Sequence, residues 1–201
     1  ALTIPAKSYT DASTAGVAHS FALAKWDGGG RYALVKHLYG EKTKWIVLDT
    51  QDSNQTVNVT QLLSVDFKDL QFAGTNGKAF YGLTTDSVIR KIDTSAATIS
   101  RGLVTHAETF TVFNNTIISY VGVDPSDATK RVAGVYRDGD EAPHILRTVA
   151  TPDVALKIAT GRYFSDDYVA IAEGGAVTIL KGTYPNSSSQ DNSSLVKFTE
   201  L

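Results

Sequence analysis

The chain of 201 residues is 42% hydrophobic and 20% charged, an ordinary globular composition that can bury a sizeable core in one or two domains. Its formal net charge of −2 argues against a domain held to nucleic acid by bulk electrostatics. No apolar run approaches the ~20 residues needed to cross a bilayer, so we expect no direct membrane insertion by this segment. The absence of cysteine excludes a disulfide framework, a thiolate metal site and a cysteine nucleophile.

Residues 1–20 are predicted to form a short N-terminal strand, Leu2–Pro5, followed by a polar linker. The chain begins at Ala1 and contains no methionine, so we expect a signal, an anchor or further domains in front of it. Its abundance of Ser, Thr and Asn is often seen in exported proteins. This composition favours an extracellular or cell-envelope location.

Residues 21–201 are organised by a repeat with a period of 44 residues. Its copies are Lys44–Asp49, Val88–Asp93, Val132–Arg137 and Ala176–Lys181. The apolar residue before each following turn keeps the same interval, at Leu48, Ile92, Tyr136 and Leu180. Two copies close identically, with Asp49-Thr50 and Asp93-Thr94. A fixed period of about 40–45 residues built from strands is typical of propeller blades.

Each copy is predicted to hold four antiparallel strands, because short β-forming runs alternate with turn residues every 8–12 residues or so. The repeats span about 21–63, 64–104, 105–149 and 150–201. Strands of the first two repeats are predicted at Phe21–Trp26, Arg31–Tyr39, Lys44–Asp49, Thr56–Leu63, Leu70–Ala73, Lys78–Leu83, Val88–Asp93 and Thr98–Val104. Those of the last two are predicted at Glu108–Phe113, Thr116–Val123, Arg131–Tyr136, His144–Val149, Val154–Phe164, Tyr168–Ala172, Ala176–Lys181 and Ser194–Phe198.

The connections carry recognisable turn signals. Asn76-Gly77 and Asn114-Asn115 lie between apolar runs and predict tight hairpins. Asp124–Lys130 is predicted to be a longer loop, and Tyr184–Ser194 a Ser/Asn-rich mobile one.

The predicted fold class is all-β, a β-propeller-like array of four four-stranded antiparallel blades. A β-sandwich or barrel also uses short strands at this spacing, but a sandwich has no reason to repeat every fourth strand. Four blades can close a small ring if Leu2–Pro5 completes the last sheet and removes its edges. The alternative, which we favour slightly, is that the chain is part of a longer array.

The four-strand unit with an acidic residue closing its third strand resembles WD40-type repeats over roughly residues 21–201. The chain departs from that family because the Gly-His pair is missing and the closing Trp-Asp is replaced by Leu48-Asp49, Ile92-Asp93, Tyr136-Arg137 and Leu180-Lys181. It is also similar to propeller segments of bacterial cell-envelope proteins. The resemblance implies binding far more often than catalysis.

Candidate catalytic groups are sparse. The histidines His19, His37, His106 and His144 lie far apart, and none has metal-ligand spacing. Gly28–Gly30 lies between two strands and opens no helix, so it is interpreted as a flexible turn rather than a phosphate site. No nucleophile elbow, Walker loop or dinucleotide fingerprint occurs. We therefore assign no catalytic, cofactor-binding or metal residue.

Acidic clusters are the remaining candidates for ion binding or acid–base chemistry. Calcium could use Asp138, Asp140 and Glu141, or Asp49, Asp52 and Asn54, but neither set matches the calcium loop of EF-hands, and solvated turns explain them better. Asp166-Asp167 is interpreted in the same way, as a turn between strands. A pair of carboxylates could run a glycosidase only if the two lie about 5–10 Å apart across a pocket.

Aromatic residues are the better indication of binding, because rings at strand ends can reach a rim where they anchor interfaces or stack on sugars. The rings considered are Trp26, Tyr32, Tyr39, Trp45, Tyr81, Tyr120, Tyr136, Tyr163 and Tyr184. Most are expected to pack between blades. Five N-x-[ST] sequons, at Asn54, Asn58, Asn114, Asn186 and Asn192, would accept glycans in a eukaryotic secretory pathway.

The favoured function is a non-catalytic binding or scaffold module whose loops contact a protein or glycan. One alternative is a propeller-type glycan hydrolase or lyase that uses acids such as Asp138, Asp140 or Asp166. Another is a structural spacer in a longer surface protein. The ligand and the oligomeric state are left open.

Overall fold

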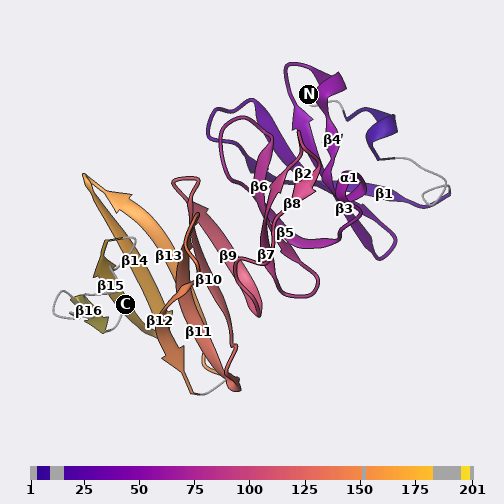
Figure 1. The fold of residues 1–201 in the computed structure, drawn as a ribbon. Coiled ribbons are helices and arrows are strands. Elements are labelled where there is room, and N and C mark those ends of the chain that lie inside the picture. The colour runs from indigo at the N-terminus through magenta and orange to yellow at the C-terminus, as the bar shows by residue number, and fades with distance from the viewer. Residues whose placement is uncertain (1–3, 10–15, 151–152, 183–195, 200–201) are drawn as a thin grey trace. The chain divides into compact units, whose positions relative to one another are not determined.

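The computed structural model describes residues 4–9, 16–150, 153–182 and 196–199. Internal contacts divide the chain into two compact units, Ala1–Thr85 with Ile89–Arg101, and Asp86–Val88 with Gly102–Leu201. Each unit contains two four-stranded antiparallel sheets whose strands follow one another along the chain (Figure 1).

The first unit begins with the short helix η1 (Ala6–Ser8) and then forms two sheets. The strands of its first sheet are β1 (His19–Trp26), β2 (Tyr32–Tyr39), β3 (Lys42–Asp49) and β4 (Val57–Asn58). The strands of its second sheet are β5 (Phe67–Phe72), β6 (Ala79–Thr84), β7 (Ile89–Asp93) and β8 (Thr98–Ile99). The helix η3 (Ser53–Gln55) lies between β3 and β4, and α1 (Val59–Leu63) follows β4.

The second unit repeats this arrangement. The strands of its first sheet are β9 (Ala107–Phe113), β10 (Ile117–Asp124), β11 (Asp127–Arg137) and β12 (His144–Val149). The strands of its second sheet are β13 (Leu156–Tyr163), β14 (Asp166–Glu173), β15 (Ala176–Lys181) and β16 (Val196–Thr199). Within the described residues no helix has the length and apolar character required to span a bilayer.

The predicted fold class is confirmed: the chain is all-β and propeller-like, with four four-stranded antiparallel blades. The residues that define the 44-residue period take equivalent places, each in the third strand of its sheet and opposite a residue of the second strand. The cross-strand pairs are Ala33–Leu48, Phe80–Ile92, Ile118–Tyr136 and Val169–Leu180. The sequence period is therefore a period of the sheets themselves.

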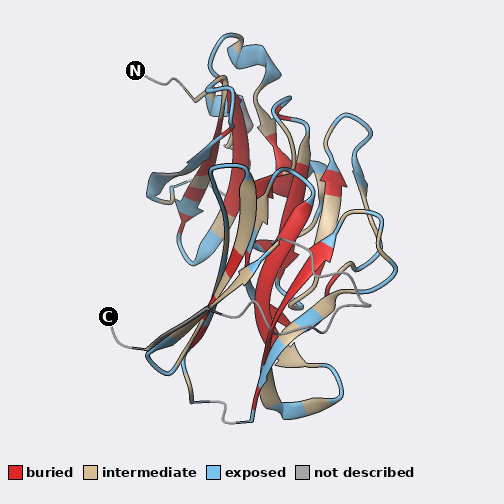
Figure 2. Ribbon diagram, turned by 90° about the vertical axis from the view of Figure 1, so that its left-hand side faces the viewer, coloured by how far each residue is buried: buried red, intermediate tan, exposed pale blue. Residues whose placement is uncertain are grey.

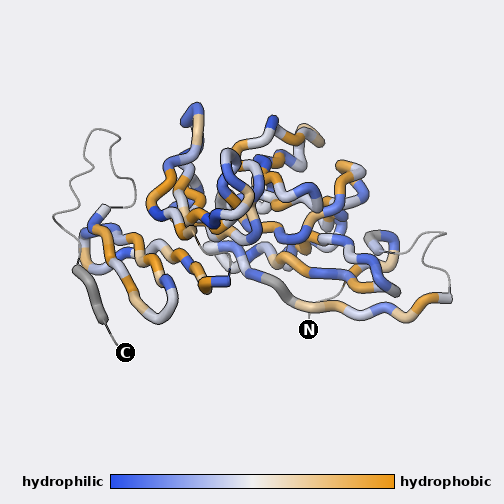
Figure 3. The backbone as a smooth tube through the Cα atoms, turned by 90° about the horizontal axis from the view of Figure 1, so that it is seen from below, coloured by the Kyte–Doolittle hydropathy of each residue, from blue (hydrophilic) through white to orange (hydrophobic). Residues whose placement is uncertain are grey.

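The inner strands β3 and β10 are buried on both faces. In β3 the six residues from Lys44 to Asp49 are all buried, and in β10 the same holds from Ile117 to Gly122. Figure 2 shows buried residues concentrated in the strands, and Figure 3 shows hydrophobic segments alternating with hydrophilic ones along the backbone. A sheet buried on both faces needs a covering layer on each side.

One face of the first sheet packs on the second sheet of its unit. Leu34, Trp45 and Val47 share a core with Phe80 and Ile92. The two sheets are also joined by hydrogen bonds, because the Trp45 indole N–H donates to the carbonyl of Phe67 at 2.9 Å and Lys25 Nζ donates to Gln71 Oε1 at 2.8 Å. In the second unit, Val121 and Ala133 share a core in the same way with Val169 and Ile171, against which Leu180 packs.

The opposite face of the first sheet carries Ala33, Val35, Ile46 and Leu48, and this face is covered by Ile4 and Tyr9. The predicted strand Leu2–Pro5 lies partly outside the described residues, and Ile4 and Pro5 are not in a strand. What the structure describes of this segment is therefore an apolar cover on a sheet face.

Two of the predicted outer strands are wrong in extent. Thr56–Leu63 forms a strand only at Val57–Asn58, because Asn58 Oδ1 accepts the N–H of Gln61 at 3.0 Å and so caps α1. The helix ends at Ser64, which has a left-handed φ of 53°. In the second sheet, Thr98–Val104 forms a strand only at Thr98–Ile99, and the Ser100 hydroxyl then accepts the N–H of Lys91 at 2.9 Å.

The predicted loop Asp124–Lys130 is also wrong, because β10 and β11 continue to a turn of Pro125 and Ser126 alone. Asp124 Oδ1 accepts the Ser126 N–H at 2.8 Å, which tightens this turn. The Asn114-Asn115 hairpin is as predicted, with φ values of 48° and 61°. Tyr184–Ser194 lies outside the described residues.

The shared core of the first unit generates a stability prediction. Ile92 is fully buried there, so we expect Ile92→Ala to lower the free energy of unfolding by about 3 kcal/mol through lost burial and a residual cavity. Urea unfolding followed by the fluorescence of Trp45, which lies in the same core, measures the change. Leu38→Ala is the control, because Leu38 lies in β2 of the same unit and is 37% exposed, and its cost should stay below about 1 kcal/mol. Equal losses in the two variants would contradict the two-sheet core.

Candidate binding site

The structure separates the aromatic residues into core and surface. Trp45, Tyr39, Tyr81, Tyr120 and Tyr136 are buried, and burial raises the pKa of Tyr120 to about 12. The rings that remain more than two-fifths exposed are Trp26 at 43%, Tyr163 at 68% and Phe164 at 85%. Tyr184 lies outside the described residues.

Tyr163 and Phe164 lie together at the end of the β13–β14 hairpin. Tyr163 is the last residue of β13 and pairs with Asp166, so Phe164 and Ser165 form the turn. The two rings meet edge to face, with centroids 4.5 Å apart and an interplanar angle of 75°. We call this pair the aromatic tip.

Phe164 occupies a conformation that large residues rarely adopt. Its φ is 53°, in the left-handed region where glycine and asparagine are favoured and other residues pay about 1 kcal/mol. The result is a phenyl ring held in solvent on a strained turn.

The charged groups beside the tip are paired with one another. Arg162 binds Asp167 through two hydrogen bonds of 2.6 and 3.2 Å, and Lys181 Nζ lies 2.7 Å from Asp166 Oδ2. Hydrogen bonding to these carboxylates raises the pKa of Arg162 and of Lys181. The Arg162 guanidinium also lies 6.0 Å from the ring centroid of Phe113, the last residue of β9. The tip therefore has a polar, charge-balanced border.

The hairpin is anchored on the neighbouring sheet of the same unit. Ser119 Oγ in β10 bonds to the hydroxyls of Thr111 in β9 and Thr160 in β13, at 3.1 and 3.2 Å. Val169 and Ile171 of β14 are buried in the shared core. The root of the hairpin is thus fixed on both strands while its end projects.

Sequence reasoning found only part of this site. Tyr163 was among the candidate rings, but Phe164 was placed inside a predicted strand, and Asp166-Asp167 was predicted as the turn. The turn lies two residues earlier, because both aspartates belong to β14 and pair with cations. A signal was present in Ser165-Asp166, since Ser and Asp favour turns and could have moved the boundary.

The acidic group around Asp49 is a turn built on an ion pair. Arg31 donates to both carboxylate oxygens of Asp49, with the shortest contact at 2.6 Å, and the backbone N–H of Gln51 adds a bond of 2.9 Å. Asp52 accepts the N–H of Asn54 and caps η3. These bonds hold the pKa of Asp49 down at about 2, and the hydrogen bond from Arg31 is the largest cause.

The second blade repeats this turn with Lys78 in the place of Arg31. Asp93 Oδ1 accepts the N–H groups of Ser95 and Ala96 at 2.7 and 3.1 Å, which lowers the pKa of Asp93. Thr50 and Thr94 each donate a hydroxyl and an N–H to one carbonyl across the sheet, that of Arg31 and that of Lys78. The repeated Asp-Thr dipeptide thus closes the third strand in both blades.

The other acidic cluster is also part of a turn. Asp140 Oδ2 accepts the N–H of Arg137 at 3.3 Å, and its carbonyl accepts the Tyr136 hydroxyl at 3.1 Å. Glu141 is exposed. In the part of the chain that the structure describes, no three His, Asp or Glu side chains are grouped to hold a metal ion.

Two of the four histidines meet, which their separation in sequence did not predict. His19 and His37 stack on adjacent strands, with 2.7 Å between His19 Nδ1 and His37 Nε2. His106 has a left-handed φ of 58°, and His144 begins β12. The Gly28–Gly30 turn is organised by Asp27, which accepts the N–H groups of Gly29 and Tyr32.

No family model and no curated protein matches the chain. Among solved structures, it is similar to an oligogalacturonate lyase from Vibrio parahaemolyticus, a β-propeller protein, with a TM-score of 0.53, 9% identity, and coverage of 85% of this chain and 52% of that one. A chain of a Saccharomyces cerevisiae complex containing Dbp5, Nup159 and Gle1 matches with a TM-score of 0.41, 11% identity, and coverage of 81% and 55%. The chain thus spans about half the length of these structures, and the likeness to the lyase supports the propeller-like fold alone.

The Asp49 turn generates a pH prediction. Because the pKa of Asp49 in the folded state, about 2, lies below the ordinary 3.8, its ionised form stabilises the fold above about pH 4 and loses that effect as the pH falls toward 2. Arg31 is 42% exposed, so we expect Asp49→Asn to cost only about 1 kcal/mol at pH 7. Urea unfolding at a series of pH values should show the two proteins converging near pH 2.

Asp93→Asn is the matched control for this variant. An asparagine oxygen can still accept the two backbone N–H groups, so the expected change is below about 0.5 kcal/mol. Equal losses in the Asp49 and Asp93 variants at pH 7 would show that the ion pair with Arg31 has no stabilising role.

Proposed function

We propose that the chain is a non-catalytic binding module, and that the aromatic tip of Tyr163 and Phe164 inserts into an apolar recess on a partner protein. The observation that carries the proposal is the exposure of these rings, 68% and 85%, at the end of a hairpin whose root is fixed. Interface energy concentrates in such aromatic anchors surrounded by a polar border. The propeller-like blades serve as the rigid scaffold for the tip.

A protein partner fits the tip better than a glycan or a nucleic acid. The Arg162–Asp167 and Lys181–Asp166 pairs balance the charge beside the rings, so there is no net attraction for phosphates. The same pairing engages the polar groups that would otherwise bond to sugar hydroxyls. What the tip offers is apolar area inside a neutral border.

The proposal also covers the type of repeat and the location at which the module works. The blades are divergent relatives of WD40-type repeats, and they work at a cell surface or in a cell envelope. The shared Asp-Thr closure of β3 and β7 supports the first statement, since an acidic residue closes the third strand of those repeats. The Ser-, Thr- and Asn-rich composition supports the second.

A propeller-type glycan hydrolase or lyase is the second candidate, favoured by the likeness of fold to the oligogalacturonate lyase. Its acids would be Asp138, Asp140 or Asp166. Asp166, the first residue of β14, is paired with Lys181. Asp140 lies in the turn after β11, where it accepts the N–H of Arg137. Activity of the wild-type chain on a glycan panel that is lost when all three are replaced by alanine would establish the enzyme and overturn the binding-only assignment.

The tip can be tested by placing a photoreactive benzoylphenylalanine at position 164. Irradiation on cells or envelope preparations should give a covalent adduct with one protein, and excess unmodified chain should abolish it. With that protein purified, we expect Tyr163→Ser and Phe164→Ser each to weaken binding by about 2 kcal/mol, roughly thirtyfold in Kd, because each removes an anchor.

Ile145 provides the matched control, since it is an exposed apolar residue of the same unit in β12. The photoreactive residue at position 145 should give no adduct with that protein, and Ile145→Ser should leave the Kd unchanged. An adduct with a glycan, or equal weakening by Ile145→Ser and Phe164→Ser, would contradict the proposal. Unchanged thermal unfolding of the variants excludes misfolding as the cause.

A further inference from the structure

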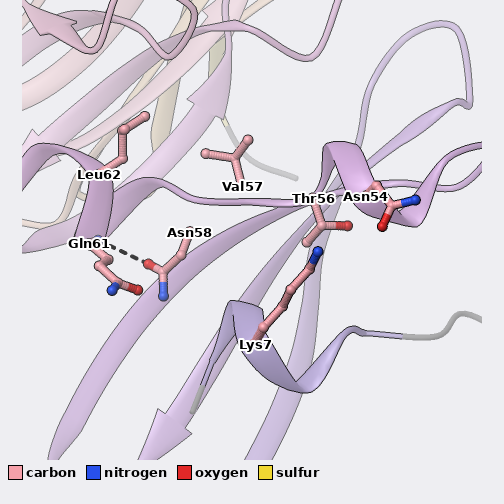
Figure 4. A pocket seen from close by; sticks show the side chains of 7 residues that line it. All are labelled: Lys7, Asn54, Thr56, Val57, Asn58, Gln61 and Leu62. Carbon is pink, nitrogen blue, oxygen red and sulfur yellow. Dashed lines mark hydrogen bonds between the residues drawn. The ribbon is translucent and has the colours of Figure 1, made fainter. Parts of the chain in front are cut away.

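The first unit contains a pocket beside the first sheet, distant in sequence from the aromatic tip. Its volume is about 480 Å³, within the 300–1,000 Å³ typical of small-molecule sites. The lining residues come from η1, from η3 and the following residue, and from β4 with α1: Lys7, Asn54, Thr56, Val57, Asn58, Gln61 and Leu62 (Figure 4).

Lys7 is the cation of the pocket. It belongs to η1, and the apolar cover of the first sheet holds this helix in place. Ile4 and Tyr9, on either side of η1, pack on the face formed by Ala33, Val35, Ile46 and Leu48. The Tyr9 ring also meets those of Phe21 and His37 edge to face, at centroid distances of 5.0 and 5.3 Å. Figure 4 shows the Lys7 ammonium directed toward Thr56.

The opposite wall presents the amide of Asn58, whose orientation is fixed by a hydrogen bond. Asn58 is 8% exposed, and its Oδ1 accepts the Gln61 N–H, so its amide nitrogen is turned away from α1 (Figure 4). Thr56 adds a hydroxyl oxygen that is buried and has no hydrogen-bond partner in the described structure. A buried polar atom without a partner is costly, and a ligand that bonds to it removes the cost.

The chemistry of this lining selects a class of ligand. It combines one ammonium, three side-chain amides and one hydroxyl, and none of the residues that line the pocket is acidic. Such a set places one positive charge among groups that both donate and accept hydrogen bonds, which suits a carboxylate that carries several hydroxyl groups. Val57 and Leu62 add aliphatic surface for the C–H groups of a ring.

We propose that this pocket binds a hexuronic acid unit, with Lys7 at the carboxylate and Asn54, Asn58, Gln61 and Thr56 at the hydroxyl groups. The site is separate from the aromatic tip, so it is tested independently of the proposed partner protein. It also gives Asn54 and Asn58 a role other than as sequons, since Asn58 is buried and caps a helix. Asn114 is exposed in a turn, and Asn186 and Asn192 lie outside the described residues.

The test titrates the intact chain with glucuronate and galacturonate, and with glucose and galactose as neutral counterparts of the same ring. The readout is the NMR side-chain amide signals of Asn54, Asn58 and Gln61, with calorimetry for affinity. We expect saturable shifts with at least one uronate and at least tenfold weaker binding of its neutral counterpart. Inorganic phosphate and acetate at the same concentration should leave these signals unmoved.

Two variants assign the charge recognition. Lys7→Gln should lower uronate affinity about tenfold and leave the neutral sugar unaffected, whereas Lys42→Gln, at an exposed lysine of β3 outside the lining, should change neither. Asn58→Asp keeps an N-cap residue that helices accept equally well and places a carboxylate in the pocket, so uronate binding should be lost with the fold intact.

Three titration results and one result with the variants would overturn the proposal. The titration results are equal binding of acidic and neutral sugars, equal shifts with phosphate or acetate, and absence of any uronate shift at these three amides. Unaltered uronate affinity in both Lys7→Gln and Asn58→Asp would do so as well. None of these outcomes bears on the aromatic tip.

Discussion

The structure depends on one constraint, which is that strands such as β3, β6 and β10 are buried on both faces, so that their sheets have to be covered twice. In the first unit, Ile92 and Phe80 of the second sheet share a core with Trp45 and Val47 of the first. In the second unit, Leu180 packs in the same way on a core that includes Val121 and Ala133. A sheet of this kind cannot be stable alone, because one exposed apolar face forfeits a large part of the burial energy of a small domain. The 44-residue period follows from this requirement, because it places an apolar residue at the same position in the third strand of every sheet.

The same constraint explains the segment before β1. The face of the first sheet that carries Leu48 is equivalent by register to the face of the second sheet that carries Ile92, which packs on a neighbouring sheet. For the first sheet, Ile4 and Tyr9 provide cover instead. Covering this face has a second effect, because it carries Lys7 to the edge of the pocket beside Asn58. A structural cap and a candidate binding site thus share one short segment.

Turns do not have to be covered on both faces. Both candidate sites lie in turns or short helices that connect the strands. At the β13–β14 turn, Phe164 is held in solvent at a positive φ, and the charges on the strands below it are paired. On either side of β4, η3 and α1 supply residues of the polar pocket wall. The blades thereby hold exposed aromatic and polar side chains at positions outside their apolar cores.

The sheets were predictable from sequence because the alternation of apolar and polar residues and the 44-residue period both correspond directly to strand geometry and strand order in the folded chain. Leu48, Ile92, Tyr136 and Leu180 fell in equivalent positions for this reason. The errors arose where a single side chain redirects the backbone, as Asn58 does by capping α1 and Asp124 by tightening the turn of Pro125 and Ser126.

The sites were less predictable than the fold. Tyr163 was recognised as a ring that could reach a rim, but the exposure of Phe164 depends on a turn position that shifted by two residues. The pocket was not predicted at all. It needs the fold to bring Lys7 and Gln61 to the lining of one pocket, and no spacing in the chain encodes that arrangement.

Native-state hydrogen exchange, measured amide by amide, tests the central claim that sheets are stable only in pairs. We expect β2 and β3 to exchange with the same opening free energy as β6 and β7, and β10 and β11 with the same opening free energy as β14 and β15, because each pair of sheets opens as one cooperative unit. If one sheet of a pair exchanged rapidly while its partner stayed protected, the shared cores would not be what holds the blades together.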